Sequence, residues 1–156
     1  MSKSNIVIAS RIRHVGIVVR NLEMSIKFYR DVLGFSIYRR CMEENSGGFI
    51  DKLTGLKGVV LESAKLSLPE GGLIELLQYH SHPDPDTFKK PENFPSNKLG
   101  CQHIAITVKD LATLYQNLVR SGYSCNSEPL LSPEGKTKTL YCHDPDGIIV
   151  ELTEDL

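Results

Sequence analysis

The hydrophobic pattern of the chain occurs twice. The segment His14–Leu22 reads as a histidine, an apolar strand, a basic residue, a polar cap and a leucine, and this pattern returns 89 residues later at His103–Leu111. Because side chains alternate across a strand, His14 shares its face with Gly16 and Val18, and His103 shares its face with Ala105 and Thr107. The residues between them are β-branched and face the other way. The repeat predicts two modules built alike.

A helix and three further strands are predicted in each module. Asn21 and Asp110 are suitable N-caps for helices whose apolar residues recur at helical spacing, and Gly34 and Gly122 suit the left-handed residue that ends a helix. The further strands are expected at 35–43 and 58–68 in the first module and at 124–131 and 136–143 in the second, each pair followed by a glycine turn and a closing strand that contains Glu75 or Glu151. Each module therefore reads as β-α-β-β-β, and the predicted fold class is α+β.

The two modules are expected to form one domain over residues 11–154. Module 1 spans 11–79, module 2 spans 101–154, and residues 80–100 hold four of the eight prolines among polar residues, which predicts a linker. Module 1 is the longer, and its surplus lies near residues 44–58. We expect a loop there that forms a lid or a substrate wall.

The composition of the chain indicates which classes of binding partner to expect. With 18 Lys and Arg against 19 Asp and Glu the net charge is −1, so the chain offers no broad basic field for nucleic acid, and a small molecule is the expected partner. The apolar runs are too short for a membrane helix or a signal peptide, which predicts a cytoplasmic protein without membrane contact. The four cysteines form no C-x-x-C pair, so they are expected to be free thiols.

Four residues of two types are the candidate site. His14 and His103 stand on the first strand of each module, and Glu75 and Glu151 stand on the last. A carboxylate buried alone on an apolar strand costs several kcal/mol. One such histidine or glutamate is usually an ordinary residue, but the same two types at matching places in both modules indicate a shared site. Two neutral imidazoles and two carboxylates suit Ni²⁺, Co²⁺, Mn²⁺, Fe²⁺ or Zn²⁺, with waters at open positions that would make the site catalytic.

Other chemical candidates are weaker. His80 and His82 are expected in an exposed loop, and Cys142 and His143 point to opposite faces of one strand, which leaves His143 as a candidate to line the cavity. The tracts Arg39-Arg40 and Lys89-Lys90 are expected to be solvated; the alternative is an arginine that binds a substrate carboxylate or phosphate.

The duplicated unit, with His on each first strand and Glu on each last one, resembles the vicinal oxygen chelate superfamily, which includes glyoxalase I and methylmalonyl-CoA epimerase. The most telling segments are 14–19, 28–35, 103–106 and 144–147 with Glu151-Leu152. The resemblance implies two tandem βαβββ modules that form a cupped, barrel-like mixed sheet with helices outside. It also implies a divalent metal ion held by His14, Glu75, His103 and Glu151, two substrate oxygens that chelate the ion, and a homodimer.

The position of Glu75 selects among members of the superfamily. Extradiol dioxygenases and fosfomycin-type thiol transferases have metal sites with three protein ligands and none at the position that matches Glu75. A glutamate at this position favours the four-ligand arrangement of glyoxalase I. The Asn-Trp-Gly segment typical of glyoxalase I is replaced by 77–80 here, which argues against glutathione as substrate. The predicted function is that of a metal-dependent isomerase, epimerase or lyase that transfers a proton next to a carbonyl, with Glu75 or Glu151 as the base. The alternatives are an extradiol-type iron dioxygenase and a resistance protein that binds a drug or metabolite.

Overall fold

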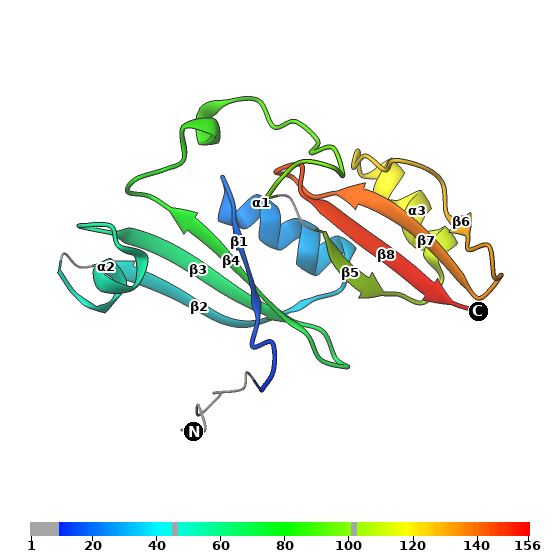
Figure 1. Ribbon diagram of the computed structural model, residues 1–156, viewed down its shortest axis with the longest axis horizontal. Coiled ribbons are helices and arrows are strands. Elements are labelled where there is room, and N and C mark those ends of the chain that lie inside the picture. The colour runs from blue at the N-terminus through cyan, green and yellow to red at the C-terminus, as the bar shows by residue number, and fades with distance from the viewer. Residues whose placement is uncertain (1–9, 45–46, 101–102) are drawn as a thin grey trace, which may run out of the picture.

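Two four-stranded mixed sheets form the framework of the protein, which we describe from a computed structural model covering residues 10–44, 47–100 and 103–156 (Figure 1). The first sheet has the order β1-β4-β3-β2 and the second the order β5-β8-β7-β6. In each sheet the first and last strands of the module pair in parallel and the remaining neighbours are antiparallel. The strands are β1 (Val15–Val18), β2 (Ser36–Glu44), β3 (Val60–Ser67), β4 (Leu73–Tyr79), β5 (Ile104–Thr107), β6 (Leu130–Leu131), β7 (Thr137–His143) and β8 (Ile149–Asp155).

A helix follows the first strand of each module, as predicted, and two shorter helices lie between β2 and β3 and after β4. The α+β fold class with tandem modules is confirmed. The helices are α1 (Leu22–Ile26) continued by η1 (Lys27–Val32), α2 (Phe49–Thr54), η2 (Pro85–Phe88) and α3 (Leu111–Arg120). The side chain of Asn21 accepts a hydrogen bond from the Met24 amide, and that of Asp110 accepts one from Thr113. These contacts satisfy amides that have no partner inside the helix.

The first helix differs from a continuous α-helix in its second half. From Lys27 to Val32 it is a π-helix, and the Leu33 amide donates to the carbonyl of Phe28, five residues earlier. This wider turn accompanies the burial of two consecutive aromatic rings, Phe28 and Tyr29, both 0% exposed. The apolar spacing predicted the buried face but not the change of helix type.

Two expectations about local structure need correction. The strand expected at 124–131 is reduced to a single bridge between Cys125 and Cys142 and the two residues of β6. Pro129 has no amide to donate to a ladder, and the Ser127 hydroxyl bonds to the local carbonyl of Glu128, so the intervening backbone leaves the sheet.

The segment expected as a plain loop near 44–58 contains the helix α2. The Asp51 carboxylate accepts hydrogen bonds from the amides of Gly47, Gly58 and Val59, and Gly55 ends the helix with φ of 73°. These charge-assisted contacts hold the pKa of Asp51 below its usual value. The segment between β2 and β3 is therefore an ordered connection that contains a short helix.

Both modules contribute to one apolar core. Figure 1 shows the sheets on either side of the molecule with α1 between them. The rings of Phe28 and Tyr123 meet edge to face across the modules, with centroids 4.8 Å apart. The core takes Ile17 from β1, Val19 from directly after β1, and Ile106 from β5. The other face of each sheet, which carries the histidines and glutamates, is consequently directed away from the shared core.

A buried polar cluster joins the modules next to this core. Arg20 forms an ion pair with Asp146 at 3.0 Å, and the Tyr29 hydroxyl donates to Asp144 at 3.1 Å. The Asp144 side chain also accepts the amides of Asp146 and Ile148. Burial outweighs these hydrogen bonds and raises the pKa of Asp144 to about 6.

Residues 80–100 connect β4 of the first module with the second module and have η2 as their regular element (Figure 1). The Phe94 amide donates to the Gly147 carbonyl at 2.9 Å, which fastens this segment to the turn before β8. Gly147 has φ of 86°, and a Cβ there would overlap the backbone carbonyl of Glu92. Within the described residues, none of the helices is both long and apolar enough to cross a membrane.

Replacing Gly147 by Ala should destabilise the protein by about 3 kcal/mol or more, because the variant combines a left-handed backbone with a clash against Glu92. Gly122→Ala is the matched control. Gly122 has φ of 81°, and a Cβ added there would meet nothing within 4 Å, so only the backbone cost of about 1 kcal/mol applies. Urea denaturation of both variants measures the difference, and equal losses would contradict the close approach at Gly147.

Replacing Asp144 by Asn should change how stability depends on pH. A carboxyl group whose pKa is raised to about 6 in the folded protein binds more protons than in the unfolded chain, so its contribution to stability is lost as pH rises from about 4 to 6. The free energy of unfolding of the wild type, relative to Asp144→Asn, should therefore fall by roughly 1 to 3 kcal/mol over this range. Parallel stability curves for the two proteins would contradict the raised pKa.

Candidate functional site

The first pair of candidate residues lies on the outer face of the β1–β4 sheet. His14 directly precedes β1, and Gly16 pairs in register with Glu75 on the parallel strand β4. This register brings Nε2 of His14 to 3.0 Å from Oε2 of Glu75, with the two side chains 29% and 17% exposed. Nδ1 of His14 is buried and has no hydrogen-bond partner among the described residues.

The second pair repeats the first. Ala105 pairs with Glu151 as Gly16 does with Glu75, and Nε2 of His103 lies 3.0 Å from Oε2 of Glu151. His103 is 47% exposed and Glu151 is 23% exposed. The sequence repeat is thus a geometric repeat, in which the same atoms meet at the same separation.

The neighbours of the two glutamates differ. In the β3–β4 hairpin Lys65 pairs in register with Glu75, and its Nζ lies 3.3 Å from Oε1 of Glu75. In the β7–β8 hairpin the residue opposite Glu151 is Tyr141, whose ring lies 5.3 Å from that of His103. One glutamate therefore has a cationic neighbour and the other an aromatic one.

Threonine hydroxyls complete the surroundings of Glu151. The side chains of Thr139 and Thr153 each lie 3.4 Å from Oε1 of Glu151 and 2.9 Å from one another. Lys65, Tyr141 and these threonines are not among the residues predicted from the sequence. A signal was available, because Lys65 and Tyr141 both precede the glutamate of their module by ten residues, the offset that both hairpins share.

The two pairs do not meet within one chain. Among the residues that the structure describes, no group of three or more His, Cys, Asp or Glu side chains is arranged to hold a metal ion. The cause is the shared core, which takes up the inner face of both sheets and directs the outer faces apart. The structure brings His14 to Glu75 and His103 to Glu151, and the combined four-ligand site remains a prediction.

Cys142 and His143 have structural roles. Cys142 is fully buried in the core, and burial raises the pKa of its thiol to about 12, which excludes an activated nucleophile. His143 lies on the other face as predicted, with Nδ1 at 3.2 Å from the Gly147 carbonyl and Nε2 at 2.8 Å from Asn126. Both nitrogens are occupied, so His143 is not a ligand here. His80 and His82 are exposed, as predicted, and His80 lies beside Glu62.

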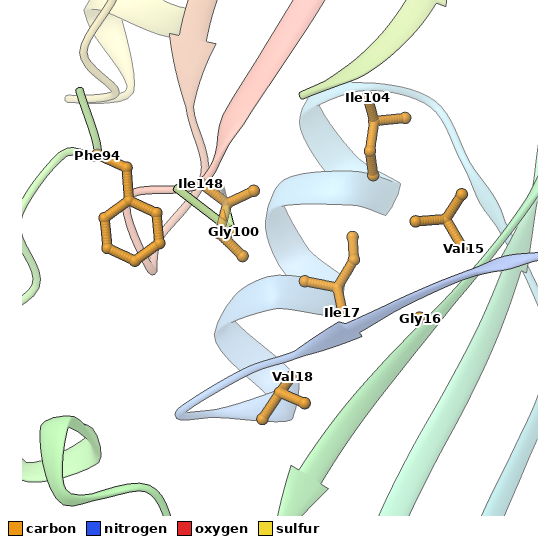
Figure 2. A pocket seen from close by; sticks show the side chains of 8 residues that line it. All are labelled: Val15, Gly16, Ile17, Val18, Phe94, Gly100, Ile104 and Ile148. Atoms are coloured by element: carbon orange, nitrogen blue, oxygen red, sulfur yellow. The ribbon is translucent and has the colours of Figure 1, made fainter. Parts of the chain in front are cut away.

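An apolar pocket of about 250 Å³ lies between the edge strands β1 and β5 (Figure 2). Phe94 stands on one side of it and Val15 on the other. None of its eight lining residues is titratable, so the pocket offers shape but no acid, base or ligand. It is lined by Val15, Gly16, Ile17, Val18, Phe94, Gly100, Ile104 and Ile148.

Comparison with known proteins agrees with this architecture. The chain is 29% identical over 146 residues to the uncharacterized protein YwbC of Bacillus subtilis, covering 92% of this chain and 97% of the relative. It is 29% identical over 145 residues to a probable lactoylglutathione lyase of Vibrio cholerae, covering 93% and 91%. A glyoxalase family protein from Bacillus cereus superimposes with a TM-score of 0.82 at 27% identity over 100% and 99% of the two chains.

A more distant structure shares the fold. The trypanothione-dependent glyoxalase I of Leishmania major superimposes with a TM-score of 0.62 at 23% identity, over 94% of this chain and 87% of that one. The model of one family matches residues 11–152, a span that includes both His–Glu pairs. The chain therefore belongs to the glyoxalase/bleomycin resistance protein/dioxygenase superfamily.

Proposed function

We propose that the protein is a divalent-metal-dependent isomerase, epimerase or lyase that transfers a proton at a carbon next to a carbonyl. The observation that carries this proposal is the pair of His–Glu contacts, each 3.0 Å, at matching positions of the two modules. Neither pair is needed for the apolar core, since both lie on the faces turned away from it. Family membership and the resemblance to a probable lactoylglutathione lyase support the same reaction class.

The geometry of each pair fits a metal ion. Imidazole nitrogen and carboxylate oxygen are the donor types that such ions bind, and two of them about 3 Å apart can hold one ion together. The separation between Nε2 and Oε2 has this value in both modules. His14, Glu75, His103 and Glu151 would hold the ion, and two neutral imidazoles with two carboxylates suit Ni²⁺, Co²⁺, Mn²⁺, Fe²⁺ or Zn²⁺.

A homodimer would complete the site. Each module exposes one His–Glu pair on an open sheet face, together with apolar groups such as Val18, which is 54% exposed. Module 1 of one chain and module 2 of a second chain would enclose the ion between two such faces and cover these groups. Two chains would then form two equivalent sites, as two-fold symmetry requires.

Proton transfer is assigned to the glutamates. A bound divalent ion would supply Lewis-acid stabilisation of the negative charge that builds on the substrate oxygens. Glu75 or Glu151 would accept the proton from the carbon and return it to the neighbouring atom. Because the two carboxylates come from opposite halves of the site, they could serve opposite faces of a planar intermediate, as an epimerisation needs.

The alternative functions fit the site less well. A three-ligand dioxygenase would leave position 75 without a ligand, whereas Glu75 contacts His14 as closely as Glu151 contacts His103. A metal-free binding protein would have no use for two matched His–Glu pairs. Indifference of metal uptake to Glu75→Ala would favour the dioxygenase, and ligand binding unaffected by chelators would favour the binding protein.

Two defective variants should complement each other in metal binding. His14→Ala and His103→Ala should each lose the ion as separate homodimers, because every site lacks one imidazole. In a purified heterodimer of the two, one site carries both substitutions and the other carries none, so half of the wild-type metal content should return. His80→Ala, in the exposed His80–Glu62 pair, is the control and should retain full metal content.

Elemental analysis of differently tagged, co-expressed chains makes this measurement without a known substrate. A heterodimer with no metal would contradict a site shared between chains. Full metal content in both single variants would contradict the ligand assignment itself.

Removing either carboxylate should suppress proton transfer. We expect both Glu75→Gln and Glu151→Gln to lower turnover. The variant that removes the general base should lose about 100-fold or more, since general acid–base groups contribute roughly 10²- to 10⁴-fold to the rate. The measurement uses the hemithioacetals of methylglyoxal with glutathione and with N-acetylcysteamine, a thiol whose amine is blocked, in D₂O. Mass spectrometry follows the lactoyl thioester and its deuterium content. Glu62→Gln is the matched control, because Glu62 also faces a histidine but lies outside the site. Wild-type rates in both site variants would contradict the mechanism.

A further inference from the structure

One row of side chains on the outer face of module 1 is not explained by metal binding. The register across the sheet places Arg39 on β2 opposite Lys65 on β3, and Lys65 opposite Glu75 on β4. Residues directly opposite each other in neighbouring antiparallel strands share a face. Arg39 and Lys65 therefore lie in line with a proposed metal ligand, on the face that would enclose the substrate.

Arg39 and its neighbour Arg40 have different environments. Arg40 faces the helix side, where it pairs with Glu23 and Glu62. Arg39 takes part in no ion pair among the described residues, and the single partner of Lys65 there is Glu75. Lys65 is 27% exposed, so its ammonium group is partly withdrawn from water and depends on that one carboxylate.

A bound divalent ion would change the charge balance around Lys65 and Arg39. The two glutamates would neutralise a divalent ion, and the imidazoles would remain neutral. Glu75 would then no longer neutralise Lys65, and Arg39 would remain uncompensated beside it. In the second module Tyr141 stands at the position that matches Lys65, and two threonine hydroxyls lie beside Glu151. The excess positive charge thus belongs to one side of the site.

We propose that Lys65, with Arg39 behind it, binds an anionic group of the substrate, a carboxylate or a phosphate, beside the metal site. This inference rests on the proposed function and adds the substrate class to it. Neighbouring strands are about 4.8 Å apart, so Lys65 lies one strand and Arg39 two strands from Glu75. The anionic group would therefore lie about 5 to 10 Å from the chelated oxygens, within a small molecule.

Matched chelators test the proposal without the natural substrate. The probes are the monohydroxamate of glutaric acid, its methyl ester, and 4-phosphonobutanohydroxamate, which has the same three-carbon spacer. All three chelate a metal ion through the same two hydroxamate oxygens. Calorimetric titration of the Co²⁺-loaded protein measures each affinity. We expect the carboxylate or the phosphonate probe to bind roughly 10-fold or more tightly than the ester, as a charge-assisted contact allows. The tighter of the two anionic probes distinguishes carboxylate from phosphate as the group recognised.

Variants assign the preference to residues. Lys65→Gln should reduce the ratio of anionic to ester affinity to near one, and Arg39→Gln should reduce it in part. Arg40→Gln, on the adjacent residue of the opposite face, should leave the ratio unchanged. The preference should also weaken between 50 and 500 mM NaCl, because salt screens the charge.

The outcomes separate the two proposals. Metal uptake and ester binding without charge preference, or a preference that survives in Lys65→Gln, would overturn this inference and leave the proposed function standing. A protein that takes up no Co²⁺ and binds none of the three probes would overturn both.

Discussion

The apolar core that the two modules share determines where the site can lie. Each strand of the site gives one face to this core, as Ile17 and Ile106 do at 5% exposure. Alternation then places the His–Glu pairs on the opposite faces, and the buried contacts of Tyr29 with Asp144 and of Arg20 with Asp146 fix the modules in this relation. The constraint leaves the two His–Glu pairs apart on one chain, which is why we propose that a second chain completes the site.

The two modules share the geometry of the His–Glu pair and differ in its surroundings. Both pairs keep the same atoms 3.0 Å apart, because the parallel strands β1–β4 and β5–β8 use the same register. The residue opposite each glutamate differs: Lys65 in one module and Tyr141 in the other. A ligand enclosed between such faces would meet positive charge on one side and hydroxyl groups on the other, so we expect substrate selection to arise from the parts of the repeat that diverged.

Local patterns in the sequence predicted most of the fold. Strand faces and the caps at Asn21 and Asp110 follow from alternation and from the repeat. The repeat also predicted a histidine and a glutamate at matching positions in each module, but not that each histidine would contact the glutamate of its own module. The separation of the pairs could not be predicted, since it depends on how Phe28 and Tyr123 pack between the modules. The π-helical turn and the loss of most of the strand at 124–131 likewise depend on packing and on backbone hydrogen bonds that have no periodic signal.

The central claim is that two chains together hold one metal ion. The most direct measurement is anomalous diffraction at the absorption edge of the ion from crystals of the metal-loaded protein. The account predicts a peak bounded by His14 and Glu75 of one chain and by His103 and Glu151 of another. A peak held by the four residues of a single chain, or a loaded crystal with no peak at either pair, would contradict it.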